Sequence, residues 1–177
     1  MFKFYVHGGS GNHGCEAIVR SSISILDKSV TLFSMNPEQD LKYNLEKICK
    51  IERDDYDFYR RGSLKWLVAA IHKRLSGYGD LATKFIRASL INQVQKGDIY
   101  FSVGGDNYCY PGVEELASVN RNLKKDGARL VLWGCSVEPD ILKRDDVKAD
   151  MRMFDLITAR ESISYEALKS VNSNTML

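Results

Sequence analysis

Three glycine-containing segments of this 177-residue chain carry the side chains best suited to bind or transform a ligand. The first, residues 8–14, reads Gly-Gly-Ser-Gly-Asn-His-Gly. Glycines let backbone N–H groups approach a ligand closely, and a histidine exchanges protons near neutral pH. This segment therefore predicts a ligand-binding loop with His13 as a candidate acid–base group. The alternative is a tight, closely packed turn with His13 on its rim.

Two later segments repeat this combination of glycine with polar side chains. Residues 104–107 read Gly-Gly-Asp-Asn, and residues 134–136 read Gly-Cys-Ser. Asp106 is suited to accept a proton or bind a sugar hydroxyl, but an aspartate at this place also caps its own loop. Arg160 follows a short apolar run, where it either pairs with a phosphate or carboxylate of a ligand or forms a structural ion pair with Glu161.

Each of these segments follows an apolar run that is typical of a buried strand. Strands are expected at residues 2–7, 30–34, 99–103, 129–133 and 156–159, and residues 174–177 begin another. Helical stretches lie between them, so the pattern predicts an α/β fold: a Rossmann-like parallel sheet flanked by helices. Ligands bind such sheets beyond the carboxyl ends of the strands, so we expect the glycine segments to meet at one edge. Residues 49–57 are expected to be irregular.

A dinucleotide cofactor is not expected, although residues 9–14 satisfy the pattern G-x-G-x-x-G between a strand and a helix. A dinucleotide site also has an acidic residue at the tip of the second strand, which binds the ribose. That tip reads Met35-Asn36-Pro37, and the next acid is Glu38. The sequence therefore predicts no cofactor.

Composition restricts the partners and the cellular location. The length fits one domain, and the net charge of +2 is too small to indicate nucleic acid as a partner. Neither a signal peptide nor an apolar run of membrane-spanning length is apparent, so a cytoplasmic location is expected. The four cysteines contain no C-x-x-C pair, which argues against a disulfide framework and a zinc ribbon. No metal site is expected.

Residues 58–76 form a basic amphipathic segment, with five lysines or arginines and no acidic residue. Its apolar residues recur at helical spacing: Leu64, Leu67, Val68, Ile71 and Leu75. A helix of this kind with a tryptophan can lie on an anionic membrane surface, which would place the protein peripherally at the inner membrane face. The pattern is more common in helices that pack the apolar stripe on their own domain, and we expect that arrangement here.

Together the motifs resemble those of the polysaccharide pyruvyl transferase family. Residues 7–18 are similar to the family's opening motif, a glycine followed by Asn-x-Gly-x-Glu-Ala. Residues 103–106 resemble its second glycine motif, residues 134–139 its G-x-S-x-x-P loop, and residues 160–164 its R-[DE]-x-x-S segment. The four matches follow the family's order across nearly the whole chain. Cys15 departs from the pattern, because many members have Asp directly before the Glu-Ala pair.

The resemblance implies a two-domain, glycosyltransferase-like (GT-B) architecture. Residues 1–177 would be its single N-terminal Rossmann-like domain, with the second domain absent. It also implies transfer of pyruvate from phosphoenolpyruvate, the donor substrate, onto a sugar of a cell-surface glycan as a ketal, in exopolysaccharide biosynthesis. The acceptor partner would be a glycan or a lipid-linked sugar. We expect the main proton donor and the phosphate clamp in the second domain, and this chain to be inactive alone.

The catalytic residues stay unknown, with His13 and Asp106 as candidates. The expected substrate-binding residues are Gly9, Ser10, Gly11, Asn12, Gly104, Gly105, Asp106, Asn107, Ser136 and Arg160. Two other functions stay open: a nucleotide-sugar-dependent glycosyltransferase domain, and a non-catalytic interaction module that contacts a membrane through residues 58–76.

Overall fold

Parallel strands form one seven-stranded sheet in the order β3-β2-β1-β4-β5-β6-β7. The computed structural model describes residues 1–109 and 112–177. Its strands are β1 (Phe2–His7), β2 (Val30–Ser34), β3 (Lys50–Arg53), β4 (Ile99–Ser102), β5 (Arg129–Cys135), β6 (Leu156–Ala159) and β7 (Thr175–Met176). The order of the strands reverses between β1 and β4, which is the switch point of a Rossmann-like sheet. The predicted α/β class is confirmed.

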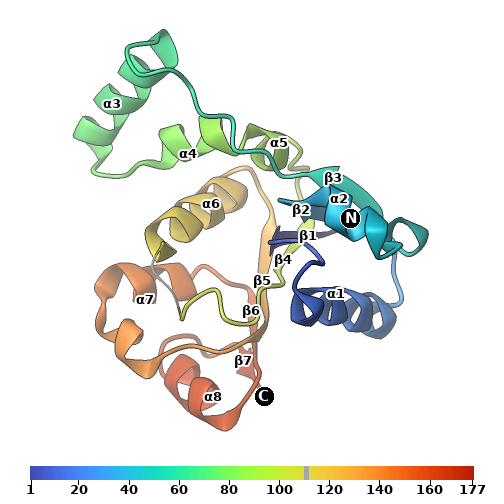
Figure 1. Cartoon of the computed structure of the whole chain (residues 1–177). Coiled ribbons are helices and arrows are strands. Elements are labelled where there is room, and N and C mark those ends of the chain that lie inside the picture. Colours follow the sequence, from blue (N-terminus) through green and yellow to red (C-terminus); the bar gives the residue numbers. More distant parts are fainter. Residues whose placement is uncertain (110–111) are drawn as a thin grey trace.

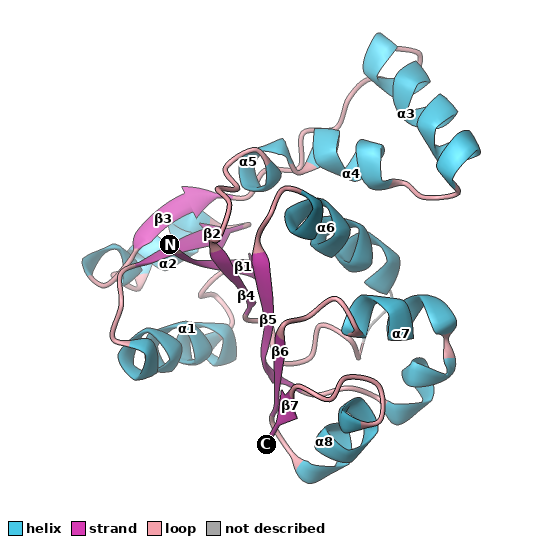
Figure 2. Cartoon of the chain, turned by 180° about the vertical axis from the view of Figure 1, so that it is seen from behind, coloured by secondary structure: helices cyan, strands magenta, loops and turns pink. Residues whose placement is uncertain are grey.

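Helices cover both faces of the sheet (Figure 1). On one face lies α1 (His13–Leu26), and on the other lie α6 (Val113–Lys125), α7 (Asp145–Met151) and α8 (Ser162–Lys169), as the reverse view in Figure 2 also shows. The β2–β3 connection contains α2 (Pro37–Lys42) and the short helix η1 (Leu45–Lys47). The β3–β4 connection contains α3 (Leu64–Ser76), α4 (Asp80–Ile86) and α5 (Ala88–Ile91), and η2 (Pro139–Lys143) precedes α7.

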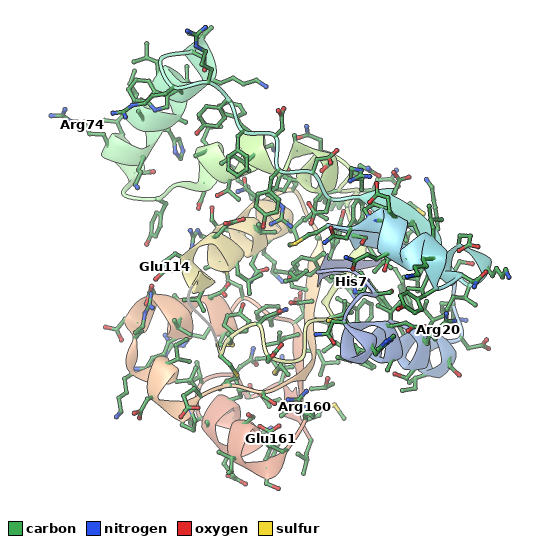
Figure 3. The ribbon with its side chains drawn as sticks, viewed as in Figure 1. His7, Arg20, Arg74, Glu114, Arg160 and Glu161 are labelled. Atoms are coloured by element: carbon green, nitrogen blue, oxygen red, sulfur yellow. The ribbon has the colours of Figure 1, made fainter. Side chains whose placement is uncertain are left out.

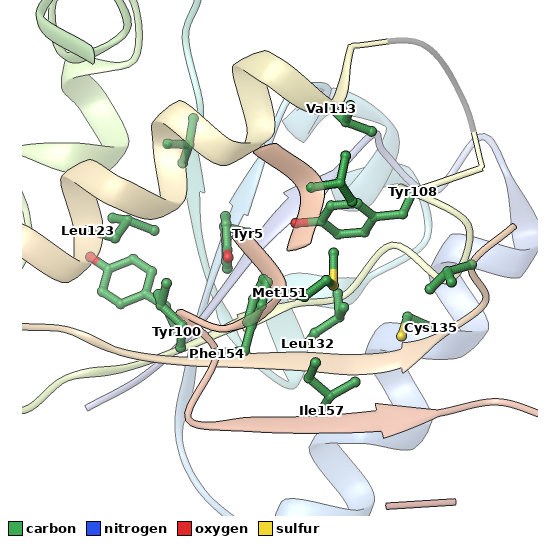
Figure 4. Close-up of a cluster of buried hydrophobic side chains, with 14 of the residues drawn as sticks. Tyr5, Tyr100, Tyr108, Val113, Leu123, Leu132, Cys135, Met151, Phe154 and Ile157 are labelled. Carbon is green, nitrogen blue, oxygen red and sulfur yellow. The ribbon is translucent and has the colours of Figure 1, made fainter. Parts of the chain in front are cut away.

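Two apolar clusters join these layers. Between the sheet and α6 and α7, the buried side chains include Tyr5, Leu132 and Met151 (Figure 4). Between the sheet and α1, Phe4 and Phe101 pack edge to face with ring centroids 5.5 Å apart. Burying a large apolar side chain contributes about 1.5–3 kcal/mol. The two clusters therefore fix the strands whose carboxyl ends carry the glycine segments.

The expectation that residues 49–57 are irregular was wrong for residues 50–53, which form β3. β3 lies at the edge of the sheet and pairs in parallel with β2. Lys50 and Glu52 form an ion pair of 2.6 Å on this strand. Charged side chains are common on edge strands because they discourage pairing with other chains. Because charged residues interrupt the apolar pattern at residues 50–53, the strand could not be predicted from the sequence.

The expectation that residues 64–75 pack their apolar stripe on the domain was also wrong. The helix α3 is present, but it packs on α4 through a side where Ala69 is buried. Leu64, Ile71 and Leu75 are 77%, 51% and 83% exposed. Figure 1 shows α3 standing away from the sheet. Within the described residues, no helix has the length and apolar character needed to span a membrane.

Candidate functional site

The carboxyl ends of β4, β5 and β6 meet at Gly105. The backbone N–H of Ser136 donates to the Gly105 carbonyl at 2.6 Å. A Cβ atom added to Gly105 would lie 2.8 Å from Arg160 Nη1 and 3.5 Å from the Gly134 carbonyl oxygen. It would also lie 3.5 Å from Ile18 Cδ1, on α1. The prediction that these segments meet at one edge of the sheet is confirmed. We call residues 104–107, Ser136 and Arg160 the sheet-edge site.

The first glycine segment is held closed by side chains of α2. The Ser10 N–H and hydroxyl donate to Asp40 Oδ1 at 3.0 and 2.6 Å, and Ser10 is buried. The Gly11 N–H donates to Gln39 Oε1 at 2.8 Å. Asn12 caps α1, accepting from the Gly14 N–H at 2.9 Å. These N–H groups, which would otherwise be available to an anion, are therefore bonded within the protein. Ligand contact by residues 9–12 stays a prediction, with Asn12 the exposed polar side chain among them.

Asp40 is the centre of the buried cluster that fixes this segment. His7 Nε2 lies 2.8 Å from Asp40 Oδ1, and both side chains are buried. Burial opposes ionisation of Asp40, but hydrogen bonds from His7 and Ser10 outweigh it and lower the pKa of this carboxyl. Ser10 donates to the carboxylate and not to the imidazole, so the cluster lacks the serine–histidine contact of a nucleophilic triad. Its role is to position the loop.

A strained residue precedes the same segment. Val6 has φ of 62°, a value that β-branched residues rarely adopt. The pairing of β1 with β2 shifts register between Phe4 and His7, as in a β-bulge. Bulges commonly re-aim a side chain beside a functional site. Here the irregularity comes directly before His7, which meets Asp40.

His13 lies on the exposed rim of the first segment. Its ring packs edge-on against Tyr43, with centroids 5.3 Å apart, and its Nδ1 lies 3.5 Å from Glu16 Oε2. Glu16 in turn accepts from Arg20 Nε at 2.7 Å. The structure therefore agrees with the alternative in which His13 lies on the rim of the turn. A catalytic role for His13 stays a prediction.

The second glycine segment turns its carboxylate outward. Gly104 and Gly105 are buried, whereas Asp106 is exposed. The Asn107 side chain folds over Gly104, and its Nδ2 donates to Ser102 Oγ at 3.4 Å. Burial raises the pKa values of Cys15 and Cys109, and the Asp106 carboxylate adds to both effects.

A buried polar network anchors this segment from the interior. The Tyr108 hydroxyl donates to Asp150 Oδ2 at 2.5 Å, and Asn120 Nδ2 donates to Asp150 Oδ1 at 2.9 Å. The Tyr5 hydroxyl donates to Asn120 Oδ1 at 2.7 Å, which links β1 to α6. Sequence reasoning missed this network because its members lie on four separate elements. Burial raises the pKa of Asp150 to about 6.

The raised pKa of Asp150 predicts a pH-dependent stability. An unfolded aspartate has a pKa of about 3.9. Between that value and the folded pKa of about 6, the native state binds more protons than the unfolded state. The free energy of unfolding should therefore fall as pH rises through this window, by about 2–3 kcal/mol from this group. Urea unfolding across the window measures the slope. The Asp150→Asn variant should lack this contribution, and an unchanged slope in that variant would contradict the assignment.

Ser136 and Arg160 complete the sheet-edge site. Ser136 Oγ donates to Glu161 Oε2 at 2.8 Å, and Ser164 also donates to Glu161. The bond from Ser164 and then that from Ser136 lower the pKa of Glu161, which stays ionised. Arg160 Nε lies 3.8 Å from Glu161 Oε2, beyond hydrogen-bond distance, and the Arg160 side chain is 57% exposed (Figure 3). The ion pair that we weighed as an alternative is present, and it is long enough to leave the guanidinium accessible.

The two buried glycines predict a graded effect of added methyl groups. A Cβ at Gly104 would lie 1.9 Å from Asn107 Oδ1, so Gly104→Ala must displace the Asn107 side chain. A Cβ at Gly105 meets the flexible end of Arg160, so Gly105→Ala should move the guanidinium with a change in unfolding free energy below about 1 kcal/mol. Thermal unfolding and ligand titration of both variants measure this. Unchanged ligand binding by Gly105→Ala would contradict a contact between the Arg160 guanidinium and the ligand.

The sheet-edge site combines a carboxylate, an amide, a hydroxyl and a guanidinium. Such a set binds an anion next to sugar hydroxyls, because the guanidinium pairs with oxyanions and the other groups exchange hydrogen bonds with hydroxyls. A cavity of about 220 Å³ opens beside Asn107, lined also by Val6, Met35 and Leu116. Among residues 1–109 and 112–177, no group of three or more His, Cys, Asp and Glu side chains is arranged to hold a metal ion.

Comparison with known proteins links this geometry to one family description. A family model described as polysaccharide pyruvyl transferase matches residues 12–176. The match runs from the cap of α1 to β7 and includes the whole sheet-edge site. No curated protein and no solved structure matches the chain.

Proposed function

Because the chain belongs to the polysaccharide pyruvyl transferase family, we propose that its sheet-edge site takes part in transfer of pyruvate from phosphoenolpyruvate to a glycan. Phosphoenolpyruvate carries a carboxylate and a phosphate, and the acceptor sugar offers two hydroxyls. The site has groups that suit both substrates. The product would be a sugar of a cell-surface glycan bearing a cyclic pyruvate ketal.

The observation that carries this proposal is the position of Arg160. Its accessible guanidinium lies at the carboxyl end of β6, against the bare backbone of Gly105. A guanidinium binds a carboxylate or a phosphate through two parallel hydrogen bonds, which fixes orientation as well as charge. Arg160 would therefore bind an anionic group of phosphoenolpyruvate, with Ser136 as a neighbouring hydroxyl.

Asp106, Asn107 and Asn12 are the groups that we assign to the acceptor. The Asp106 carboxylate is exposed and accepts hydrogen bonds from hydroxyls, whereas an amide both donates and accepts. A carboxylate within hydrogen-bond distance of a sugar hydroxyl is also placed to take its proton. Asp106 is therefore our candidate for the base, and His13 remains a group on the rim.

Ketal formation places distinct demands on the protein. A general acid protonates the terminal methylene carbon of phosphoenolpyruvate, which becomes the methyl group. Two sugar hydroxyls then bond to the adjacent carbon, each losing its proton, while the bond from that carbon to the phosphate oxygen breaks. One of the two hydroxyl protons makes up for the proton that the methylene carbon gained, and the other leaves with inorganic phosphate. The protein must therefore supply an acid, a base and cations for the phosphate.

We propose that the sheet-edge site supplies only part of this set. Arg160 is the cation of the site, whereas phosphoenolpyruvate carries two anionic groups. The proton donor and the phosphate clamp would come from a second domain in a two-domain, GT-B-like arrangement. In that case residues 1–177 alone bind substrates in the cytoplasm without turning them over.

Ligand binding and turnover test the two parts of this proposal separately. Thermal shift and titration of residues 1–177 should detect phosphoenolpyruvate, and an Arg160→Ala variant should lose that response. Phosphate release from phosphoenolpyruvate and a glycan acceptor should be absent with this chain alone; release would overturn the division between domains. Binding of nucleotide sugars in place of phosphoenolpyruvate would overturn the pyruvyl transfer function and favour a glycosyltransferase domain.

A further inference from the structure

The apolar stripe of α3 faces away from the rest of the domain. Its members lie three or four residues apart on one side of the helix and are exposed: Leu64, Leu67, Val68, Ile71 and Leu75. The opposite side meets α4, where Ala69 is buried and Lys65 Nζ lies 5.9 Å from the centre of the Phe85 ring. An amphipathic helix normally buries its apolar side, so this orientation leaves a surface that lacks a partner within the described residues.

The segment that carries the stripe is basic and contains exposed aromatic side chains. Residues 58–79, which we call the α3 arm, contain no Asp or Glu. Their basic residues are Arg60, Arg61, Lys65, Lys73 and Arg74. Arg74 projects outward from α3 in Figure 3. Phe58, Trp66 and Tyr78 are exposed as well, and tryptophan and tyrosine are typical of membrane–water interfaces.

The α3 arm is fixed to the domain at both ends. Before it, Asp54 forms a buried ion pair with Arg87, whose guanidinium lies 4.5 Å from the centre of the Tyr56 ring. After it, Asp80 binds Arg121 of α6 through a contact of 2.6 Å. The helix itself is capped by Ser63, whose side chain accepts from the Trp66 N–H. The stripe is thus carried by a helix with defined ends and a defined orientation.

We propose that the α3 arm docks this protein on an anionic lipid bilayer. The apolar stripe would enter the boundary between head groups and acyl chains, and Arg60, Arg61 and Arg74 would contact anionic head groups. A second copy of the chain is a poorer occupant, because a symmetric contact would bring the same basic side chains together without compensating acids. The inference does not depend on the proposed transferase activity.

Vesicle co-sedimentation tests this surface. The full chain should bind phosphatidylcholine vesicles that contain phosphatidylglycerol, bind pure phosphatidylcholine vesicles much less, and dissociate as salt is added. Reversing Arg60, Arg61 and Arg74 to Glu should weaken binding at least tenfold, since each basic residue near an anionic surface contributes about a fivefold change. Replacing Ile71 and Leu75 by Ser should also weaken binding at least tenfold through loss of apolar burial.

Control variants elsewhere on the surface test whether the position of the changed residues matters, or only the change in net charge and apolar surface. Lys28, Lys47 and Lys125 are exposed, and reversing them to Glu changes the net charge equally. Ile25 and Ile163 are exposed at 70% and 68%, and replacing them by Ser removes similar apolar surface. Both controls should bind vesicles within about twofold of the parent protein, because neither set lies in the α3 arm.

Three vesicle results would overturn the proposal: no sedimentation of the parent chain with anionic vesicles, binding by both variants of the α3 arm at the level of the parent, or an equal loss of binding in the controls. A further measurement excludes self-association: light scattering should show the same mass for the parent and for the Ile71→Ser, Leu75→Ser variant. A dimer that dissociates in this variant, without vesicle binding, would identify a second copy as the occupant and overturn the proposal.

Discussion

Arg160→Ala should weaken the binding of phosphoenolpyruvate by about ten- to hundredfold, because hydrogen bonds to charged groups contribute about 1.5–3 kcal/mol. Its guanidinium is accessible and lies 3.8 Å from its neighbouring carboxylate, so the loss should come from ligand contact and not from the fold. Arg160→Lys should recover only part of the affinity, since lysine keeps the charge but lacks the planar pair of donors. Isothermal titration measures all three proteins.

The matched control for Arg160 is Arg129, an exposed arginine at the opposite end of the sheet. Arg129 is the first residue of β5, whereas Arg160 directly follows the last residue of β6. The two arginines therefore lie at opposite ends of the parallel strands. Arg129→Ala should bind phosphoenolpyruvate as the parent does, and both alanine variants should melt close to the parent. Equal losses in both variants would show that general positive charge, and not the sheet-edge site, attracts the ligand.

Asp54→Ala should lower the free energy of unfolding by about 3–5 kcal/mol, because it leaves the buried Arg87 guanidinium without its main counter-ion. Arg87 Nε donates to Asp54 Oδ1 at 2.9 Å, and the two side chains are only 4% and 0% exposed. Glu115, at 3.2 Å from Arg87 Nη1, is half exposed and compensates only partly. Urea unfolding measures the loss.

The neighbouring residue provides a control for Asp54. Arg53 pairs with Glu38 at the surface, and exposed pairs contribute about 0–1 kcal/mol. Arg53→Ala should therefore cost far less than Asp54→Ala. Replacing Asp54 and Arg87 together by Leu should cost less than Asp54→Ala alone, since the unpaired charge is then removed. Similar small losses for Asp54→Ala and Arg53→Ala would show that burial of this pair has been overstated.

The sequence allowed the sheet and the meeting of its glycine segments at one edge to be predicted, because both depend on local patterns. Apolar runs such as residues 99–103 ended at glycines, and parallel strands bring such ends together. The structure confirms the meeting of residues 104–107 with Ser136 and Arg160. The order of the four motifs predicted the family, which the match over residues 12–176 confirms.

The rest depended on contacts between distant residues. Gln39 and Asp40 accept hydrogen bonds from the first glycine segment, although their helix lies about 30 residues further along the chain. No local sequence pattern predicts these contacts. Tyr108, Asn120 and Asp150 form their network in the same way. The spacing of residues 64–75 identified a helix but gave the wrong side for packing. Periodicity reveals that an apolar side exists, whereas tertiary structure decides what covers it.

Titration of the nitrogen-labelled protein with phosphoenolpyruvate, followed by amide NMR, tests the central claim most directly. If the loops after β4, β5 and β6 form one ligand site, shifts should concentrate at residues 104–107, 134–137 and 160–161, and Arg160→Ala should need about ten- to hundredfold more ligand to produce them. No shifts at saturating ligand, or shifts confined to the opposite edge near Asp98 and Arg129, would contradict it.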